Sequence, residues 1–129
     1  MKRYHLFLFI LLCVAVLTGY SQDKKEKKAK EATITGEVTD VKCYLNGMAS
    51  SSDDHTQCAI DCIKGGLPVG VVEDKTEKLY VLVPERGMKG ANEELVKYAS
   101  HKVKITGTFR EKGGQKMFFY TKVEEAEKE

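Results

Sequence analysis

The chain has 129 residues, of which 21 are lysine or arginine and 19 are aspartate or glutamate, so its formal net charge at pH 7 is +2. This length suits one domain and not two. The near-neutral charge argues against a nucleic-acid-binding protein, which normally carries a clear excess of basic residues on its domain.

The first 21 residues have the pattern of an export signal. A basic start precedes an apolar run over residues 6–17, which is shorter than the ~20 residues needed to span a bilayer. We expect cleavage after Ser21, which places the exported protein in the periplasm or outside the cell. A lipid anchor on Cys13 is the alternative, although the residue before it is not small.

The exported part is predicted to be a single domain over residues 32–124. It follows a lysine-rich, disordered linker at residues 22–31 and precedes an acidic tail at residues 125–129. Alternating and short apolar runs predict five strands, at about residues 33–39, 67–72, 79–83, 102–109 and 117–123.

Two helices are expected between these strands. The first runs from a cap at Ser52 or Asp53 to about Lys64, and the glycine pair that follows stops it. The second is capped by Asn92 and has an apolar stripe that includes Leu95. A mainly β chain with this order predicts a five-stranded, OB-like barrel with a helical insertion after the first strand and a helix between the third and fourth strands. An SH3-like barrel and an α+β sandwich are the alternatives.

Three short segments carry a resemblance to a known family. They are G-x-V-x-D-x-x-C at residues 36–43, H-x-x-C-x-x-x-C-I-x-x-G from His55, and the strand Val-Lys-Ile-Thr-Gly at residues 103–107. Together they resemble a family of small exported bacterial proteins with OB-like domains. The resemblance implies the fold and export, and it implies no activity.

Four side chains predict a metal site. His55, Cys58 and Cys62 fall within about 60° of one face of the predicted helix, and Cys43 comes from the end of the first strand. Tetrahedral zinc sites take four cysteine or histidine ligands, and thiolates also suit Cu(I). We therefore expect a zinc or copper ion on these four residues.

Two neighbours of this set have supporting roles in the same hypothesis. Met48 lies in the insertion and offers a thioether if the ion is copper. Asp40 can hold the imidazole ring of the histidine ligand by a hydrogen bond.

Other roles for the same residues stay open. In an oxidising compartment Cys43 can bridge Cys58 or Cys62, which would make a disulfide-stapled binding module for a small ligand or an envelope protein. The cysteines can also simply pack as small apolar residues. An enzyme in which His55 activates a cysteine is a further alternative, although no C-x-x-C redox motif is present. No nucleic acid partner and no membrane span after cleavage are expected.

Overall fold

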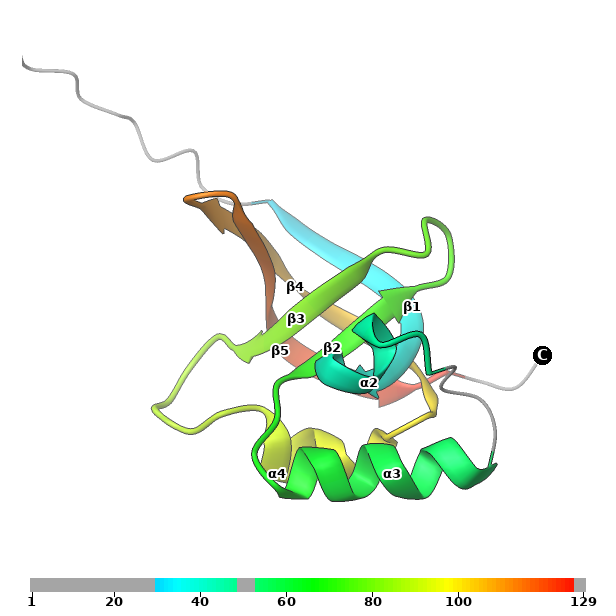
Figure 1. The fold of residues 1–129 in the computed structure, drawn as a ribbon. Coiled ribbons are helices and arrows are strands. Elements are labelled where there is room, and N and C mark those ends of the chain that lie inside the picture. The colour runs from blue at the N-terminus through cyan, green and yellow to red at the C-terminus, as the bar shows by residue number, and fades with distance from the viewer. Residues whose placement is uncertain (1–29, 49–52, 127–129) are drawn as a thin grey trace, which may run out of the picture.

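A computed structural model describes residues 30–48 and 53–126. The predicted leader, its cleavage site, most of the linker and the candidate cap Ser52 lie outside the described residues. Within these residues lie five strands, three short helices and one 3-10 turn (Figure 1). In chain order they are β1 Glu31–Asp40, α2 Val41–Leu45, α3 Asp53–Lys64, β2 Val69–Glu73, β3 Leu79–Pro84, α4 Asn92–Leu95, the 3-10 helix η1 Val96–Tyr98, β4 Lys102–Lys112 and β5 Gln115–Glu125.

The strands close into a barrel in the order β1-β2-β3-β5-β4. All neighbouring pairs are antiparallel except β3 and β5, which are parallel. The long strand β1 closes the sheet, because it pairs with β4 along residues 31–37 and with β2 along residues 36–40. The predicted mainly β, five-stranded, OB-like barrel with its two helical segments is confirmed.

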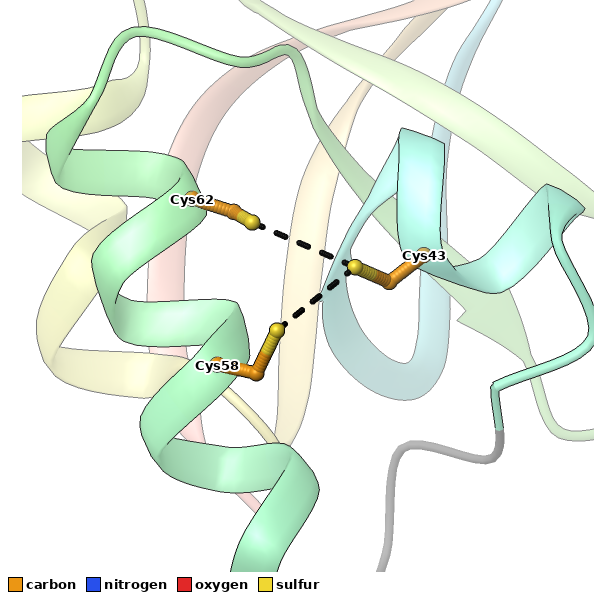
Figure 2. A group of neighbouring side chains, drawn as sticks. All are labelled: Cys43, Cys58 and Cys62. Atoms are coloured by element: carbon orange, nitrogen blue, oxygen red, sulfur yellow. Dashed lines mark hydrogen bonds between the residues drawn. The ribbon is translucent and has the colours of Figure 1, made fainter.

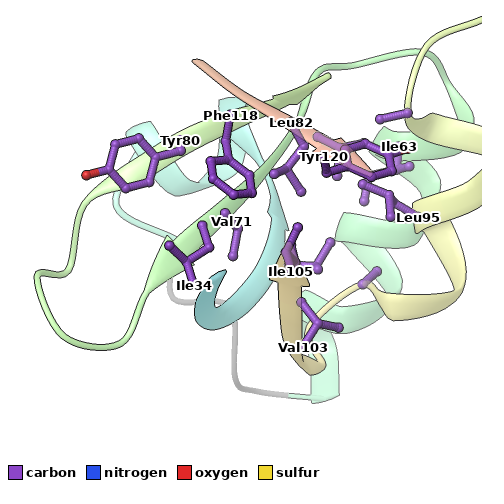
Figure 3. Packing of buried hydrophobic residues seen from close by; sticks show 14 of the residues in the cluster. Ile34, Ile63, Val71, Tyr80, Leu82, Leu95, Val103, Ile105, Phe118 and Tyr120 are labelled. Carbon is purple, nitrogen blue, oxygen red and sulfur yellow. The ribbon is translucent and has the colours of Figure 1, made fainter. Parts of the chain in front are cut away.

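The hydrophobic core fills the barrel and continues under the helices that cover one end of it (Figure 3). Phe118 has no exposed surface and lies near the middle of this core. Toward the other end, the ring of Phe109 lies edge-on to Phe118 and Tyr80, with centroids 4.7 and 4.9 Å apart. At the covered end, Ile63 of α3 and Leu95 of α4 are completely buried. The barrel is therefore closed at this end by the same helix that carries the predicted ligands.

Gly36 lies where β1 changes partner, opposite Glu73 of β2 and Val103 of β4. A Cβ atom at this position would lie 2.1 Å from the carbonyl oxygen of Val72. Only glycine lets the two strands approach this closely. The bend that closes the barrel therefore depends on this residue.

Gly36→Ala is expected to lower the free energy of unfolding by about 2 kcal/mol or more, because the strands must separate to admit the new methyl group. Urea denaturation measures the change. The matched control is Thr35→Ala, at the exposed neighbouring position of β1, which should cost less than about 1 kcal/mol. Equal losses in the two variants would contradict this account of the bend.

Candidate metal centre

Cys43 is held in place by the short helix α2, which starts where β1 ends. Asp40, the last residue of β1, caps this helix: its Oδ1 atom accepts a hydrogen bond of 2.8 Å from the backbone N–H of Cys43. The N–H of Val41 donates to the carbonyl of Pro68 at 3.0 Å. These two bonds tie α2 to the barrel. This helix was not predicted from the sequence, although an aspartate three residues before Cys43 is a normal N-cap signal.

Cys58 and Cys62 are aimed by the buried face of α3. Ala59 and Ile63 pack into the core with 3% and 0% of their surface exposed. Ala59 directly follows Cys58, and Ile63 directly follows Cys62. One residue corresponds to a turn of about 100° around the helix axis. Fixing the apolar face against the barrel therefore turns both thiols toward α2. The spacing of the two cysteines predicted their shared face of the helix, but not the direction of that face.

The end of α3 is fixed by a backbone motif and by a side chain from another helix. Gly66 has a φ of 93°, and the N–H groups of Gly66 and Leu67 donate to the carbonyls of Ile63 and Cys62. This is the Schellman pattern that glycine favours at a helix end. Asn92 donates from its amide to the carbonyls of Ile63 and Leu67, at 2.8 and 2.6 Å. The prediction that Asn92 caps its own helix is wrong, because α4 has no side-chain cap bond and the amide is used on α3.

The three thiols meet between α2 and α3 (Figure 2). The Cys43 sulfur lies 3.8 Å from that of Cys58 and 3.9 Å from that of Cys62. All three sulfurs lie within 4.8 Å of one another, and all three cysteines are free thiols. These separations are far longer than the ~2.05 Å of a disulfide bond. The three cysteines of the predicted four-residue set therefore form one cluster.

His55 lies beside this group and not within it. The group of ligand atoms within 4.8 Å of one another comprises the three sulfurs alone among the described residues. His55, one turn of α3 before Cys58, lines a small pocket of about 10 Å³ that also borders Asp40, Cys43 and Met48. Free space of this size admits about one water-sized sphere. The pocket therefore joins the predicted histidine, the candidate thioether and two of the thiols in one place.

Asp40 was predicted to lie beside the site, but the burial of its carboxylate was not predicted from the sequence. Its side chain has no exposed surface, and its Oδ2 atom has no hydrogen-bond partner among the described residues. A buried polar atom left without a partner costs free energy, so native structures rarely contain one without a reason. A cation in the adjoining pocket would supply the missing interaction.

Burial and the neighbouring groups raise the pKa of two of the three thiols, those of Cys43 and Cys62. Burial is the main cause that raises the pKa of Cys43 to about 12, and contacts with Cys58 and Asp40 add to it. Burial also raises the pKa of Cys62. The thiolate form that binds metals is therefore disfavoured until a cation is present to stabilise it.

Searches against known protein families, curated proteins and solved structures find no match. The family resemblance of the three segments thus stays a prediction. Within the part of the chain that the structure describes, no helix has the length and apolar character needed to cross a membrane.

Alkylation of the metal-free protein at pH 8 should label Cys58 well before Cys43. Cys58 is exposed, whereas a pKa of about 12 against an ordinary 9.0 leaves Cys43 with about a thousandfold less thiolate than an ordinary cysteine. Iodoacetamide labelling followed by peptide mass spectrometry gives the order. The thiolate fraction of Cys43 rises steadily as the pH approaches its pKa of about 12. The difference in labelling rate between Cys58 and Cys43 should therefore be smaller at pH 10 than at pH 8. Faster labelling of Cys43 than of Cys58 at pH 8 would contradict the pKa shift.

Proposed function

We propose that this protein binds a zinc or copper ion through the thiolates of Cys43, Cys58 and Cys62, with His55 as the fourth ligand. The observation that carries the proposal is the convergence of three sulfurs, 3.8 and 3.9 Å apart for the two closest pairs. A tetrahedral centre with Zn–S bonds of about 2.3 Å holds its sulfurs about 3.8 Å apart. The thiols are thus spaced for one ion, with no large rearrangement of either helix.

His55 is supported as the fourth ligand by its place and its charge. It lines the same pocket as Cys43 and Cys58, one helical turn from the latter. A neutral imidazole adds no further negative charge to a site that already holds three thiolates. Asp40 lines the same pocket, and its Oδ2 atom, which has no partner among the described residues, is suited to accept a hydrogen bond from the ring N–H that does not face the ion.

Charge balance favours zinc over copper. Three thiolates and a buried carboxylate are four negative charges, of which Zn²⁺ offsets two and Cu⁺ only one. The feature that favours copper is Met48, whose thioether belongs to a lining residue of the same pocket. Loading the protein with each ion separately, and then in competition, distinguishes them.

The position of the site favours metal handling over a purely structural role. None of the three cysteines belongs to the hydrophobic core, which is built from strands, α3 and the α4 region. The barrel closes by strand pairing that does not involve them. Cys58 is exposed, so a bound ion lies near the surface, where it can exchange with another carrier. Together with the predicted export signal, this supports metal binding in the cell envelope.

Each ligand variant is expected to weaken zinc binding by more than ~100-fold. Loss of a group that only hydrogen-bonds to a metal ligand typically weakens binding by about 10–100-fold, and loss of the ligand itself should cost more. The variants are Cys43→Ser, Cys58→Ser, Cys62→Ser and His55→Ala, and competition with a chromogenic chelator measures their affinity. The unchanged protein should bind one zinc per chain. His101→Ala is the matched control, because His101 is exposed and its Nδ1 atom lies 3.6 Å from the Glu125 carboxylate, away from the site. Zinc binding that survives in Cys62→Ser would contradict the site.

Asp40→Asn separates the two roles of the carboxylate. The amide oxygen can still accept from the Cys43 N–H, so the metal-free protein should keep its melting temperature. Loss of the negative charge should weaken zinc binding by about 10–100-fold. Calorimetric melting of the metal-free protein and zinc titration measure the two effects. Unchanged zinc affinity in a folded Asp40→Asn protein would mean that Asp40 serves only as a helix cap.

A further inference from the structure

Cys43 is placed as the common partner of two other thiols. Its sulfur is almost equally distant from those of Cys58 and Cys62, and it faces both across the gap between α2 and α3 (Figure 2). Cys58 and Cys62 lie four residues apart on one helix, where a strain-free disulfide between them is not favoured. Any intramolecular disulfide in this group is therefore expected to include Cys43.

The two helices differ in how firmly they are held. Helix α3 is anchored by buried apolar side chains and by the Asn92 amide at its end. Helix α2 has five residues, none of them fully buried, and is tied to the barrel side by the Asp40 cap, the Val41 hydrogen bond and an exposed Tyr44 hydroxyl that donates to the carbonyl of Glu77. Formation of a disulfide needs a further approach of the sulfurs by about 1.8 Å. Side-chain rotation with a small shift of α2 supplies it without disturbing the core.

Exposure distinguishes the two thiols that Cys43 can reach. Cys58 is exposed, whereas Cys62 is only partly exposed. A reagent from solution therefore meets Cys58 first, and Cys43 lies 3.8 Å behind it. This is the arrangement of an attacking thiol with a resolving thiol in reach.

We propose that Cys58 is an oxidation site for organic disulfides, that Cys43 resolves the product, and that the resulting Cys43–Cys58 disulfide releases the bound metal ion. The release step rests on the proposed metal site, whereas the oxidation step does not.

The reaction balances as thiol–disulfide exchange. The Cys58 thiolate attacks one sulfur of the organic disulfide, which forms a mixed disulfide and expels one thiolate. In the metal-free protein Cys43 first gives its proton to solvent, whereas in the metal-bound protein it is already a thiolate. The Cys43 thiolate then attacks the Cys58 sulfur and expels the second thiolate of the organic disulfide. The two cysteines lose two electrons, and the organic disulfide is reduced to two thiols. The ion loses two of its sulfur ligands and departs into water, while Cys62 remains a thiol.

The test uses the full chain carrying Cys13→Ser, so that the three clustered cysteines are its only thiols. Glutathione disulfide is added to the metal-free and the zinc-loaded protein, and peptide mass spectrometry maps the bonds over time. We expect transient glutathione on Cys58, then a Cys43–Cys58 disulfide, together with one zinc released per chain to a chelating dye. A dithiol reductant should restore zinc binding.

Two variants make the order of events falsifiable. In the metal-free state, Cys43→Ser should stop at the glutathione adduct on Cys58, and Cys62→Ser should still form the Cys43–Cys58 disulfide at a rate within a few-fold of the metal-free unchanged protein. Circular dichroism checks that both are folded. A first product that joins Cys43 to Cys62, or a glutathione adduct that persists on Cys58 in the unchanged protein, would overturn the proposal.

The failures of the two proposals are distinguishable. Zinc that binds but stays bound after the disulfide forms would overturn the release step alone. A protein that forms the disulfide but never binds zinc or copper would overturn the metal site, and the release step with it, while leaving the oxidation step standing.

Discussion

The hydrogen bond from the Cys43 backbone N–H to the Asp40 carboxylate links the candidate metal site to the barrel. Asp40 ends β1 and is completely buried, so the pairing of β1 with β2 fixes its position. One oxygen starts α2 and sets the place of Cys43. The other is left without a partner beside the thiols. A single carboxylate thus positions one ligand and gives the pocket a negative group that a cation can satisfy.

Helix α3 performs two tasks that share one constraint. Its buried face, with Ala59 and Ile63, closes an end of the barrel, and the adjacent face carries the cysteines. Any rotation of the helix about its axis would move both its buried face and its cysteines. Packing in the core therefore determines how precisely Cys58 and Cys62 face Cys43, and the Asn92 amide keeps the end of the helix from fraying.

The sequence predicted the parts of this structure that repeat locally. Alternation along residues 102–109 and the glycine pair after Lys64 indicated β4 and the end of α3, because strand and helix periods and helix-stop signals are short-range properties. Helix α2 was missed, since five residues contain too few turns to show a helical period. The role of Asn92 was assigned wrongly, because its partners lie on an element 25 or more residues away.

At the site, too, the features set by neighbouring residues were predicted, and those set by tertiary contacts were not. The spacing of His55, Cys58 and Cys62 predicts a shared helix face from local geometry alone. The approach of Cys43 depends on how the chain between β1 and α3 folds back, and it is a tertiary property that no spacing contains. The burial of Asp40, which leaves one oxygen without a partner, is of the same kind. These two features turned a set of candidate ligands into a site with a definite geometry.

X-ray absorption spectroscopy of the zinc-loaded protein tests the central claim most directly, because it reports the atoms bound to the ion. We expect three sulfurs at about 2.3 Å and one nitrogen at about 2.0 Å from zinc. A first coordination sphere of oxygen and nitrogen alone, or one with fewer than three sulfurs, would contradict the account.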